Sequence, residues 1–339
     1  MTATESHARA SGYDPPIIEL PPLFQRPRRP LAWLRWNVGS FLWPQSLAWI
    51  AIAAVAWNFF TPSFSRMTDL RFDWIALIYI RNVVLMLVVV GGQHYWLHIR
   101  KSQKMRYKYD PRWLATNRKR FLFGHQTRDN MLWSLASGAL IAALYESFVL
   151  WIYANEWVAS ITWSQSWVYV LAILFATFYI EGVHFYLNHR LLHTNRLYKW
   201  AHSLHHKNIN TGPWSGIAMH PVEHLLYFSL PLVFLVIPAS PMVVAFCGIY
   251  LMLSPSPSHS GFDRFELGGD RTFHGGDYFH NLHHRYFECN YGMLLLPIDK
   301  WAGTFHDGSP EAHKKIKQKK RQPHRRRRVR KETAQLQNL

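Results

Sequence analysis

The stretch that decides the fold is residues 163–206, WSQSWVYVLAILFATFYIEGVHFYLNHRLLHTNRLYKWAHSLHH. Its first part, Trp163 to Leu187, is apolar and about long enough to cross a bilayer core of roughly 30 Å as a helix. Two histidine clusters follow, His189-Arg-Leu-Leu-His193 and His202-Ser-Leu-His205-His206. The pattern predicts a membrane helix that leads directly into a histidine-rich site.

The composition of the whole chain also points towards lipid. Apolar residues make up 49% of the 339 residues and charged residues only 17%, whereas soluble domains usually have about 25% charged residues. The formal net charge is +18, which favours an anionic surface as a partner. With only Cys247 and Cys289 present, a disulfide framework and a cysteine-based metal cluster are excluded.

Apolar blocks recur along the chain and predict an all-α, polytopic membrane bundle. A fifth apolar stretch, Leu225 to Ser254, contains three prolines, which fits a membrane hairpin or two tilted crossings better than one straight helix. A helical cap holding the histidines is expected to complete the fold. The four crossings are expected at Phe41 to Phe60, Trp74 to Gly92, Met131 to Ala154 and Trp163 to Leu187.

Loop charge predicts the orientation, because Lys and Arg near membrane segments are retained in the cytoplasm. The loop at 96–130 is rich in both, whereas the 155–162 connection has neither. With four crossings, both termini and the histidine-rich region are expected on the cytoplasmic side. The membrane would be the inner membrane in a bacterium or the endoplasmic reticulum in a eukaryote.

The ends of the chain are polar, and three domains are expected. Residues 1–30 are predicted to be a disordered cytoplasmic arm, 31–305 the membrane-bound domain with its catalytic region at 165–305, and 306–339 a basic tail. The tail is expected to face anionic lipid headgroups. Nucleic acid is not an expected partner, because no recognition fold accompanies the basic run.

A third cluster, His280-Asn-Leu-His283-His284, completes the histidine pattern. Residues three and four apart share a helix face, so each cluster presents its imidazoles towards one point. One metal ion takes four to six ligands, so eight imidazoles suit a pair of ions better than one. Imidazole binds iron, zinc, copper and nickel; iron fits a site that activates O2 against a lipid C–H bond, and zinc fits the same ligands.

Several motifs carry a resemblance to a known family. Besides the three clusters, they include Ala218-Met-His220-Pro-Val-Glu223, Asn290-Tyr-Gly292 and Asp299-Lys-Trp-Ala-Gly303-Thr304. Over residues 165–305 the chain resembles the fatty acid hydroxylase/sterol desaturase superfamily. The resemblance implies an integral-membrane, non-haem di-iron enzyme that uses O2 and two electrons, with ligands at His189, His193, His202, His205, His206, His280, His283 and His284.

Further residues are candidates for the same site. Additional ligands, or residues that hydrogen-bond to ligands, are His220, His259, His224 and His274, of which His220 and His259 have the more family-like surroundings. Glu181 lies within an apolar block shortly before the first cluster, and a role in a substrate channel is expected for it.

The residues leave several functions open. Hydroxylation of a fatty acyl, polar lipid or sterol-like substrate is the main expectation, and desaturation at the same site is the alternative. Electrons from NAD(P)H would arrive through a separate cytochrome b5-like or ferredoxin donor with its reductase, since the chain has no Rossmann glycine motif or cysteine cluster. More distant alternatives are a metal transporter and a zinc metallohydrolase using His220-Pro-Val-Glu223-His224 as an HxxEH motif.

Overall fold

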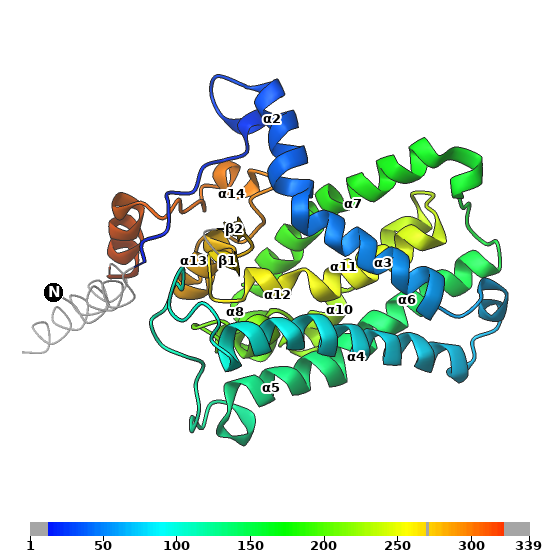
Figure 1. Cartoon of the computed structure of the whole chain (residues 1–339), viewed down its shortest axis with the longest axis horizontal. Helices are drawn as coiled ribbons and strands as arrows, with labels where there is room; N and C mark the ends of the chain where they lie inside the picture. The colour runs from blue at the N-terminus through cyan, green and yellow to red at the C-terminus, as the bar shows by residue number, and fades with distance from the viewer. Residues whose placement is uncertain (1–12, 269–270, 322–339) are drawn as a thin grey trace, which may run out of the picture.

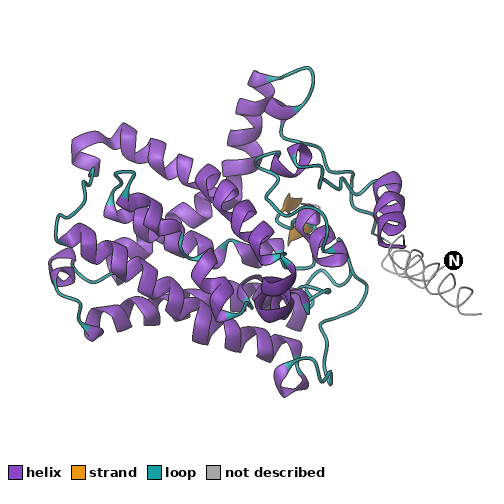
Figure 2. Ribbon diagram, turned by 180° about the vertical axis from the view of Figure 1, so that it is seen from behind, coloured by secondary structure: helices purple, strands orange, loops and turns teal. Residues whose placement is uncertain are grey.

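The computed structural model describes residues 13–268 and 271–321. Long helices run along the longest axis of the molecule, and short helices and the two strands gather at one end (Figure 1). Seen from behind, the strands again lie among helices and loops at that end (Figure 2). The predicted helical bundle with a cap is confirmed, and we call the short elements at this end the cap.

Five helical stretches are long and apolar enough to cross a membrane, and they make the chain a multi-pass membrane protein. They are Pro30–Phe60, Phe72–Ile99, Gln126–Ala154, Trp163–Leu192 and Pro241–Ser258. The regular helices within them are α2 (Pro30–Trp36), α3 (Leu47–Phe60), α4 (Phe72–His94), α5 (Gln126–Leu132), α6 (Ala139–Ala154), α7 (Trp163–Leu192), α11 (Pro241–Leu253) and α12 (Pro255–Ser258). Wider π-helical turns join several of them, at Asn37–Ser46, Tyr95–Ile99 and Trp133–Gly138.

Helix α11 forms the centre of the bundle. It contacts α3, α4, α6 and α7, and all its residues except Met242 are buried. The segment before it consists of α10 (Pro221–Tyr227) and a 3-10 helix at Leu230–Leu235. The chain turns at 236–240, so the stretch 225–254 is broken in two, as its prolines suggested.

A buried ion pair joins two of the long helices. Arg81 of α4 donates to the carboxylate of Glu146 on α6, and both side chains are almost completely buried. Arg81 also donates to Thr61 Oγ1 at 2.9 Å and to Asn82 Oδ1 at 2.9 Å. The guanidinium therefore has several oxygen partners, which is what makes a charge tolerable among apolar helices.

The cap is assembled from short elements that follow α7. Strands β1 and β2 pair antiparallel, with Phe265 opposite Phe273. The bounds of the cap elements are α8 (Asn195–Leu197), a π-helical turn at Tyr198–His202, α9 (Ser203–His206), a 3-10 helix at Pro213–Ile217, β1 (Arg264–Gly268), β2 (Arg271–His274), α13 (Tyr278–Tyr286) and α14 (Ile298–Trp301).

The basic loop between α4 and α5 packs on this cap. Tyr109 N donates to Gly261 O at 3.0 Å, and Asp263 N donates to Tyr107 O at 2.8 Å. Short 3-10 helices at Pro22–Phe24, Phe64–Thr68 and Leu122–Gly124 complete the described elements. The connection 155–162, which has no Lys or Arg, instead meets the turn before α11, where Ser160 pairs with Ala239.

The N-terminal arm from residue 13 onwards is packed against the cap. The hydroxyl of Tyr13 donates to Asp263, and Ile18 N donates to Asp307 O at 2.8 Å. Ile18 also packs on a small apolar cluster of the cap that includes Ile316. The expected disorder of the arm therefore does not apply to residues 13–30, and 306–321 of the expected tail is folded onto the cap. Residues 1–12 and 322–339, with six of the twelve Lys and Arg residues of the tail, lie outside the described residues.

Candidate metal centre

Helix α7 carries the first two histidines of the site into the cap. Its N-terminus is capped by Thr162 and Gln165, and His189 and His193 lie one turn apart at its C-terminal end. His189 is only 3% exposed. The membrane helix thus delivers its last turn directly to the site, as residues 163–206 predicted.

The other two clusters lie on short helices. His202, His205 and His206 lie on the π-helical turn and α9, and all three are buried. Helix α13 begins at Tyr278 because Asp277 caps it, accepting from His280 N at 3.0 Å. It ends at Phe287, whose backbone is left-handed with φ 66°. Because α13 is so short, its histidines sit at a defined position between two fixed ends.

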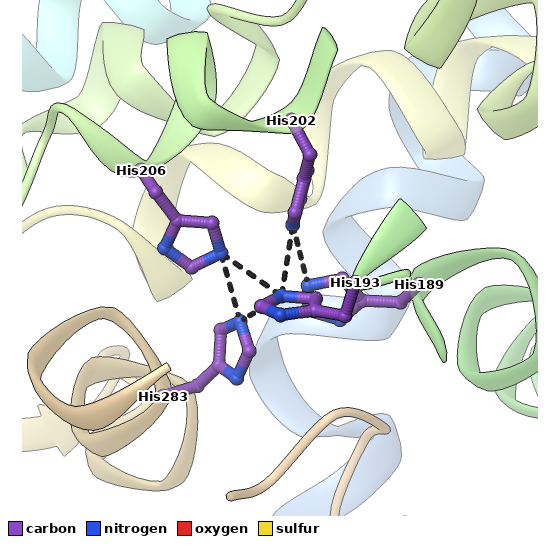
Figure 3. Close-up of side chains that lie close together, drawn as sticks. All are labelled: His189, His193, His202, His206 and His283. Carbon is purple, nitrogen blue, oxygen red and sulfur yellow. Dashed lines mark hydrogen bonds between the residues drawn. The ribbon is translucent and has the colours of Figure 1, made fainter. Parts of the chain in front are cut away.

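The structure brings nine histidines into two groups. In each group, one nitrogen from every ring lies within 4.8 Å of those of the others. The first group is His189, His193, His202, His206 and His283, and the second is His205, His259, His280 and His284. The side chains of the first group point towards one another from three separate segments (Figure 3).

The contacts of the first group cannot all be hydrogen bonds. The Nε2 atoms of His193, His206 and His283 lie 3.1–3.2 Å from one another. Each Nε2 either carries a hydrogen or presents a lone pair, so among three mutual contacts at least one pair must match and repel. A cation among them removes the conflict, because every nitrogen can then present its lone pair.

Backbone carbonyls fix which nitrogen faces inward. His189 Nδ1 donates to Tyr291 O at 2.6 Å, and His283 Nδ1 donates to Cys289 O at 2.7 Å. A carbonyl only accepts, so these rings carry their hydrogen on Nδ1 and turn the Nε2 lone pair towards the group. The same device orients metal-binding histidines in proteins generally.

The second group is built in the same way around His259. Its Nδ1 donates to Pro255 O at 2.9 Å, and its Nε2 lies 3.1 Å from Nε2 of both His280 and His284. Two imidazole nitrogens bound at right angles to one ion at about 2.1 Å would lie about 3.0 Å apart. The donor sets and their spacing therefore fit a metal ion in each group.

Burial keeps these rings neutral. It lowers the pKa of His202 to about 3 and that of His259 to about 4. Burial, together with the neighbouring histidines, also holds the pKa values of His205, His206 and His284 well below their usual range. At neutral pH the lone pairs are therefore available to a metal without first losing a proton.

The remaining predicted residues lie outside the two groups. His220 Nδ1 accepts from Val222 N at the start of α10, and His224 contacts Ser137 Oγ and Ile217 O. His274 is half-exposed on β2, 3.6 Å from Asp263. Among the described residues, the HxxEH pattern of His220, Glu223 and His224 forms no metal-binding group.

Glu223 was not among the predicted site residues, although its motif was noted. Its Oε1 lies 2.8 Å from His202 Nδ1. The carboxyl is 2% exposed, and burial raises its pKa well above the usual range. Glu223 is 21 residues from His202 in the sequence and meets it only in the folded chain, so the spacing gave no signal. Its place in His220-Pro-Val-Glu223 was the single sequence clue.

Asp299 holds the loop that orients His189. Its carboxylate accepts from Tyr291 N at 2.9 Å and from Gly292 N at 2.7 Å, and Thr304 Oγ1 also donates to it. A side chain at Gly292 would place its Cβ 3.0 Å from the same carboxylate, which explains the glycine. The motifs around 290–292 and 299–304 are thus two halves of one support for the site.

We expect Asp299→Ala to lower the metal affinity of the first group by about tenfold to 100-fold, because the Tyr291 carbonyl would lose its anchor. Metal content after dialysis against a graded chelator series measures this. Asp307→Ala is the matched control, since that carboxylate caps only Ser309 N. Equal metal retention in the Asp299 variant and the control would contradict the role.

A cavity of about 320 Å³ opens beside the two groups. Its wall includes His189, His202, His205, His259 and His280. From there it reaches between membrane helices, where it is lined by Trp36, Phe41, Trp49, Glu181, Phe185, Tyr227 and Tyr250. The volume suits a small or chain-like apolar ligand. Glu181, expected in a channel, lies on this wall.

Comparison with known proteins bears on the same region. The fatty acid hydroxylase family model matches residues 173–304. Residues 173–304 therefore form a region similar to the fatty acid hydroxylase/sterol desaturase superfamily. The resemblance over 165–305 is thereby confirmed, and the matched hydroxylase domain contains all nine grouped histidines.

Individual curated relatives are also similar to part of this chain. A Delta(7)-sterol 5(6)-desaturase of Gibberella zeae is 33% identical over 43% of this chain and 45% of its own length. Methylsterol monooxygenase 1 of Gallus gallus is 31% identical over 46% of this chain and 52% of its own length. A very-long-chain aldehyde decarbonylase of Arabidopsis thaliana is 29% identical over 43% of this chain and 25% of its own length. The chain spans about half or less of the length of these relatives. No solved structure matches.

Proposed function

We propose that this chain is an integral-membrane, non-haem di-iron oxygenase that uses O2 and two electrons to hydroxylate a C–H bond of a lipid. The observation that carries the proposal is the pair of all-imidazole groups at the end of a cavity that reaches into the membrane helices. Five and four nitrogens leave a six-coordinate ion with open positions. Relatives whose names specify sterol desaturation and methylsterol oxygenation support it.

Each part of the site has a role in this proposal. His189, His193, His202, His206 and His283 would hold one iron ion, and His205, His259, His280 and His284 the other. When bound, the iron pair supplies the redox chemistry that activates O2 and cleaves the C–H bond. The carbonyls of Tyr291, Cys289 and Pro255 orient the ligands, and the apolar cavity wall excludes water and positions the lipid.

Desaturation is the second candidate, because several relatives are named as sterol desaturases. It would use the same ligands and the same cavity. Metal transport is disfavoured, since transport sites lie near the bilayer midplane, whereas both groups lie at the end of α7. Metallohydrolysis through the HxxEH pattern is disfavoured because Glu223 and His224 are engaged elsewhere.

The electrons would come from a separate donor, cytochrome b5-like or a ferredoxin, that is reduced by NAD(P)H through its reductase. The basic loop between α4 and α5 supports this, because it covers the cap and would attract an acidic donor. Its charge also supports a cytoplasmic location of the cap and both termini. The basic tail would then lie near the anionic surface of the same membrane.

The test is the full-length protein produced with iron and purified in detergent. We expect two iron ions per chain by elemental analysis. Lipid extracts from cells with the protein should contain a species heavier by one oxygen atom, or lighter by two hydrogens for a desaturase, and only when O2 is present. Full activity with a single ion per chain, or product formed without O2, would contradict the proposal.

A further inference from the structure

The inner end of the cavity contains an unusual carboxyl group. Glu181 lies on α7 two turns before His189, about 12 Å along the helix axis. It is 3% exposed and lines the cavity. Its Oε2 atom is buried and has no hydrogen-bond partner within residues 13–268 and 271–321. A buried polar atom without a partner is costly, so an occupant of the cavity is the natural partner.

The neighbours of Glu181 leave that oxygen free. The phenol of Tyr250 on α11 lies on the same cavity wall, close enough to the Glu181 carboxyl to interact with it. The hydroxyl of Tyr227, on the same wall, instead donates to Leu251 O at 2.9 Å. No Lys or Arg in the described part of the chain forms an ion pair with Glu181. The Glu181 carboxyl therefore has one phenol beside it on the wall and keeps a buried oxygen available to an occupant of the cavity.

The charges around the cavity decide which polar group fits there. Its ionisable wall residues, apart from histidines and tyrosines, are Glu181, Glu223 and Asp277, with no Lys or Arg. At the Glu181 end of the cavity, a carboxylate or phosphate would find no Lys or Arg to pair with it. A neutral hydroxyl can donate to a carboxylate and accept from a phenol, so it satisfies both Glu181 and Tyr250.

We propose that Glu181 and Tyr250 bind the hydroxyl group of a neutral lipid and so select hydroxyl-bearing substrates over anionic ones. The inference rests on the proposed function for the identification of the cavity as the substrate site. Glu181 is about 12 Å along the axis of α7 from His189, the first metal-centre histidine on that helix. The oxidised carbon would therefore be remote from the anchored hydroxyl in the substrate.

Binding of matched probes tests this without turnover. The iron-loaded, full-length protein in detergent is titrated with radiolabelled hexadecanol, hexadecane and palmitate, and with cholesterol and its methyl ether. We expect a hydroxyl-bearing probe to bind roughly tenfold more tightly than its matched partner without the hydroxyl, and palmitate to bind more weakly than hexadecanol. If the hexadecanol pair shows the difference, the cavity prefers a chain-like lipid. If the cholesterol pair shows it, the cavity prefers a ring-like lipid.

Variants assign the preference to the two residues. Glu181→Leu should abolish the preference for hydroxyl-bearing probes, and Tyr250→Phe should weaken it. Glu181→Gln keeps a hydrogen-bond acceptor and should retain most of this preference. Tyr145→Phe is the matched control and should leave the hydroxyl preference unchanged, because Tyr145 is not on the cavity wall and its hydroxyl donates to Leu225 O at 2.9 Å. The iron content and the size-exclusion profile show whether each variant is folded. The probe series on the wild-type protein tests the inference even if a variant does not fold.

Palmitate binding as tightly as hexadecanol, no hydroxyl preference in either probe pair, or an undiminished preference in folded Glu181→Leu would overturn the inference. These outcomes concern binding alone. A hydroxyl preference that depends on Glu181, in a protein that holds two iron ions but oxidises no lipid, would support the inference and count against the proposed function.

Discussion

His283→Ala abolishes lipid oxidation, with an expected loss of more than about 100-fold, and removes iron from the first group. The side chain is completely buried, and its Nε2 lies within 3.2 Å of Nε2 of both His193 and His206. Loss of a residue that merely orients a ligand already costs about tenfold to 100-fold in metal affinity or activity, so loss of a ligand should cost more. Activity, bound iron and membrane-inserted protein are measured together.

His274→Ala is the matched control for this experiment. His274 lies in the same segment of the chain, on β2, but it is half-exposed and outside both groups. We expect it to retain activity and both iron ions. Near-normal turnover in a correctly inserted His283→Ala variant would mean that the histidine groups are structural, and the oxygenase proposal would have to be abandoned.

Arg81→Met lowers the free energy of unfolding by about 3–5 kcal/mol, because it leaves Glu146 buried without its cation. The double variant Arg81→Met with Glu146→Leu should recover most of that loss, since apolar replacements remove both charges from the bundle. Unfolding of the purified protein in a graded SDS series, followed by circular dichroism, measures the three stabilities.

The exposed pair of Arg66 and Asp73 provides the comparison for the buried one. Arg66→Met should change stability little, because water solvates the charge that remains. If the single Arg81 variant were as stable as the wild type, or the double variant no better than the single, the buried pair would not be the link between α4 and α6 that its contacts indicate.

The sequence predicted the helices and the histidine clusters well, because both follow from periodicity. Apolar runs long enough to cross a bilayer identified α3, α4, α6 and α7. Histidines three and four apart indicated rings on one face of a short helix. The break before α11 followed from three prolines, whose missing N–H groups and fixed φ interrupt a helix.

How the histidines divide between the two groups could not be predicted from spacing. On α9 and the turn before it, His202 and His206 join the first group and His205 the second; on α13, His280 and His284 join the second group and His283 the first. Each pair four residues apart serves one group, while the remaining ring reaches the other. That division depends on how the two helices face each other, which is tertiary information.

His259 and the N-terminal arm also make contacts that sequence patterns could not predict. His259 stands alone in sequence, and only the fold places it 3.1 Å from His280 and His284. Residues 13–30 are polar and proline-rich, which is typical of disorder, yet Tyr13 and Ile18 find partners on the cap. Neither local composition nor spacing contains those distant contacts.

The division of the rings of α13 between both groups sets the order of events during biosynthesis. A ribosome adds about 5–20 residues per second, so several seconds separate the synthesis of α9 from that of α13. Until α13 emerges, the first group lacks His283 and the second lacks His280 and His284. Both groups are then completed by the arrival of a single helix, after every membrane helix of the described chain has been made. A nascent chain would therefore have no complete histidine group before α13 is made, and on the proposed function the full metal centre would form only in the last stage of its maturation.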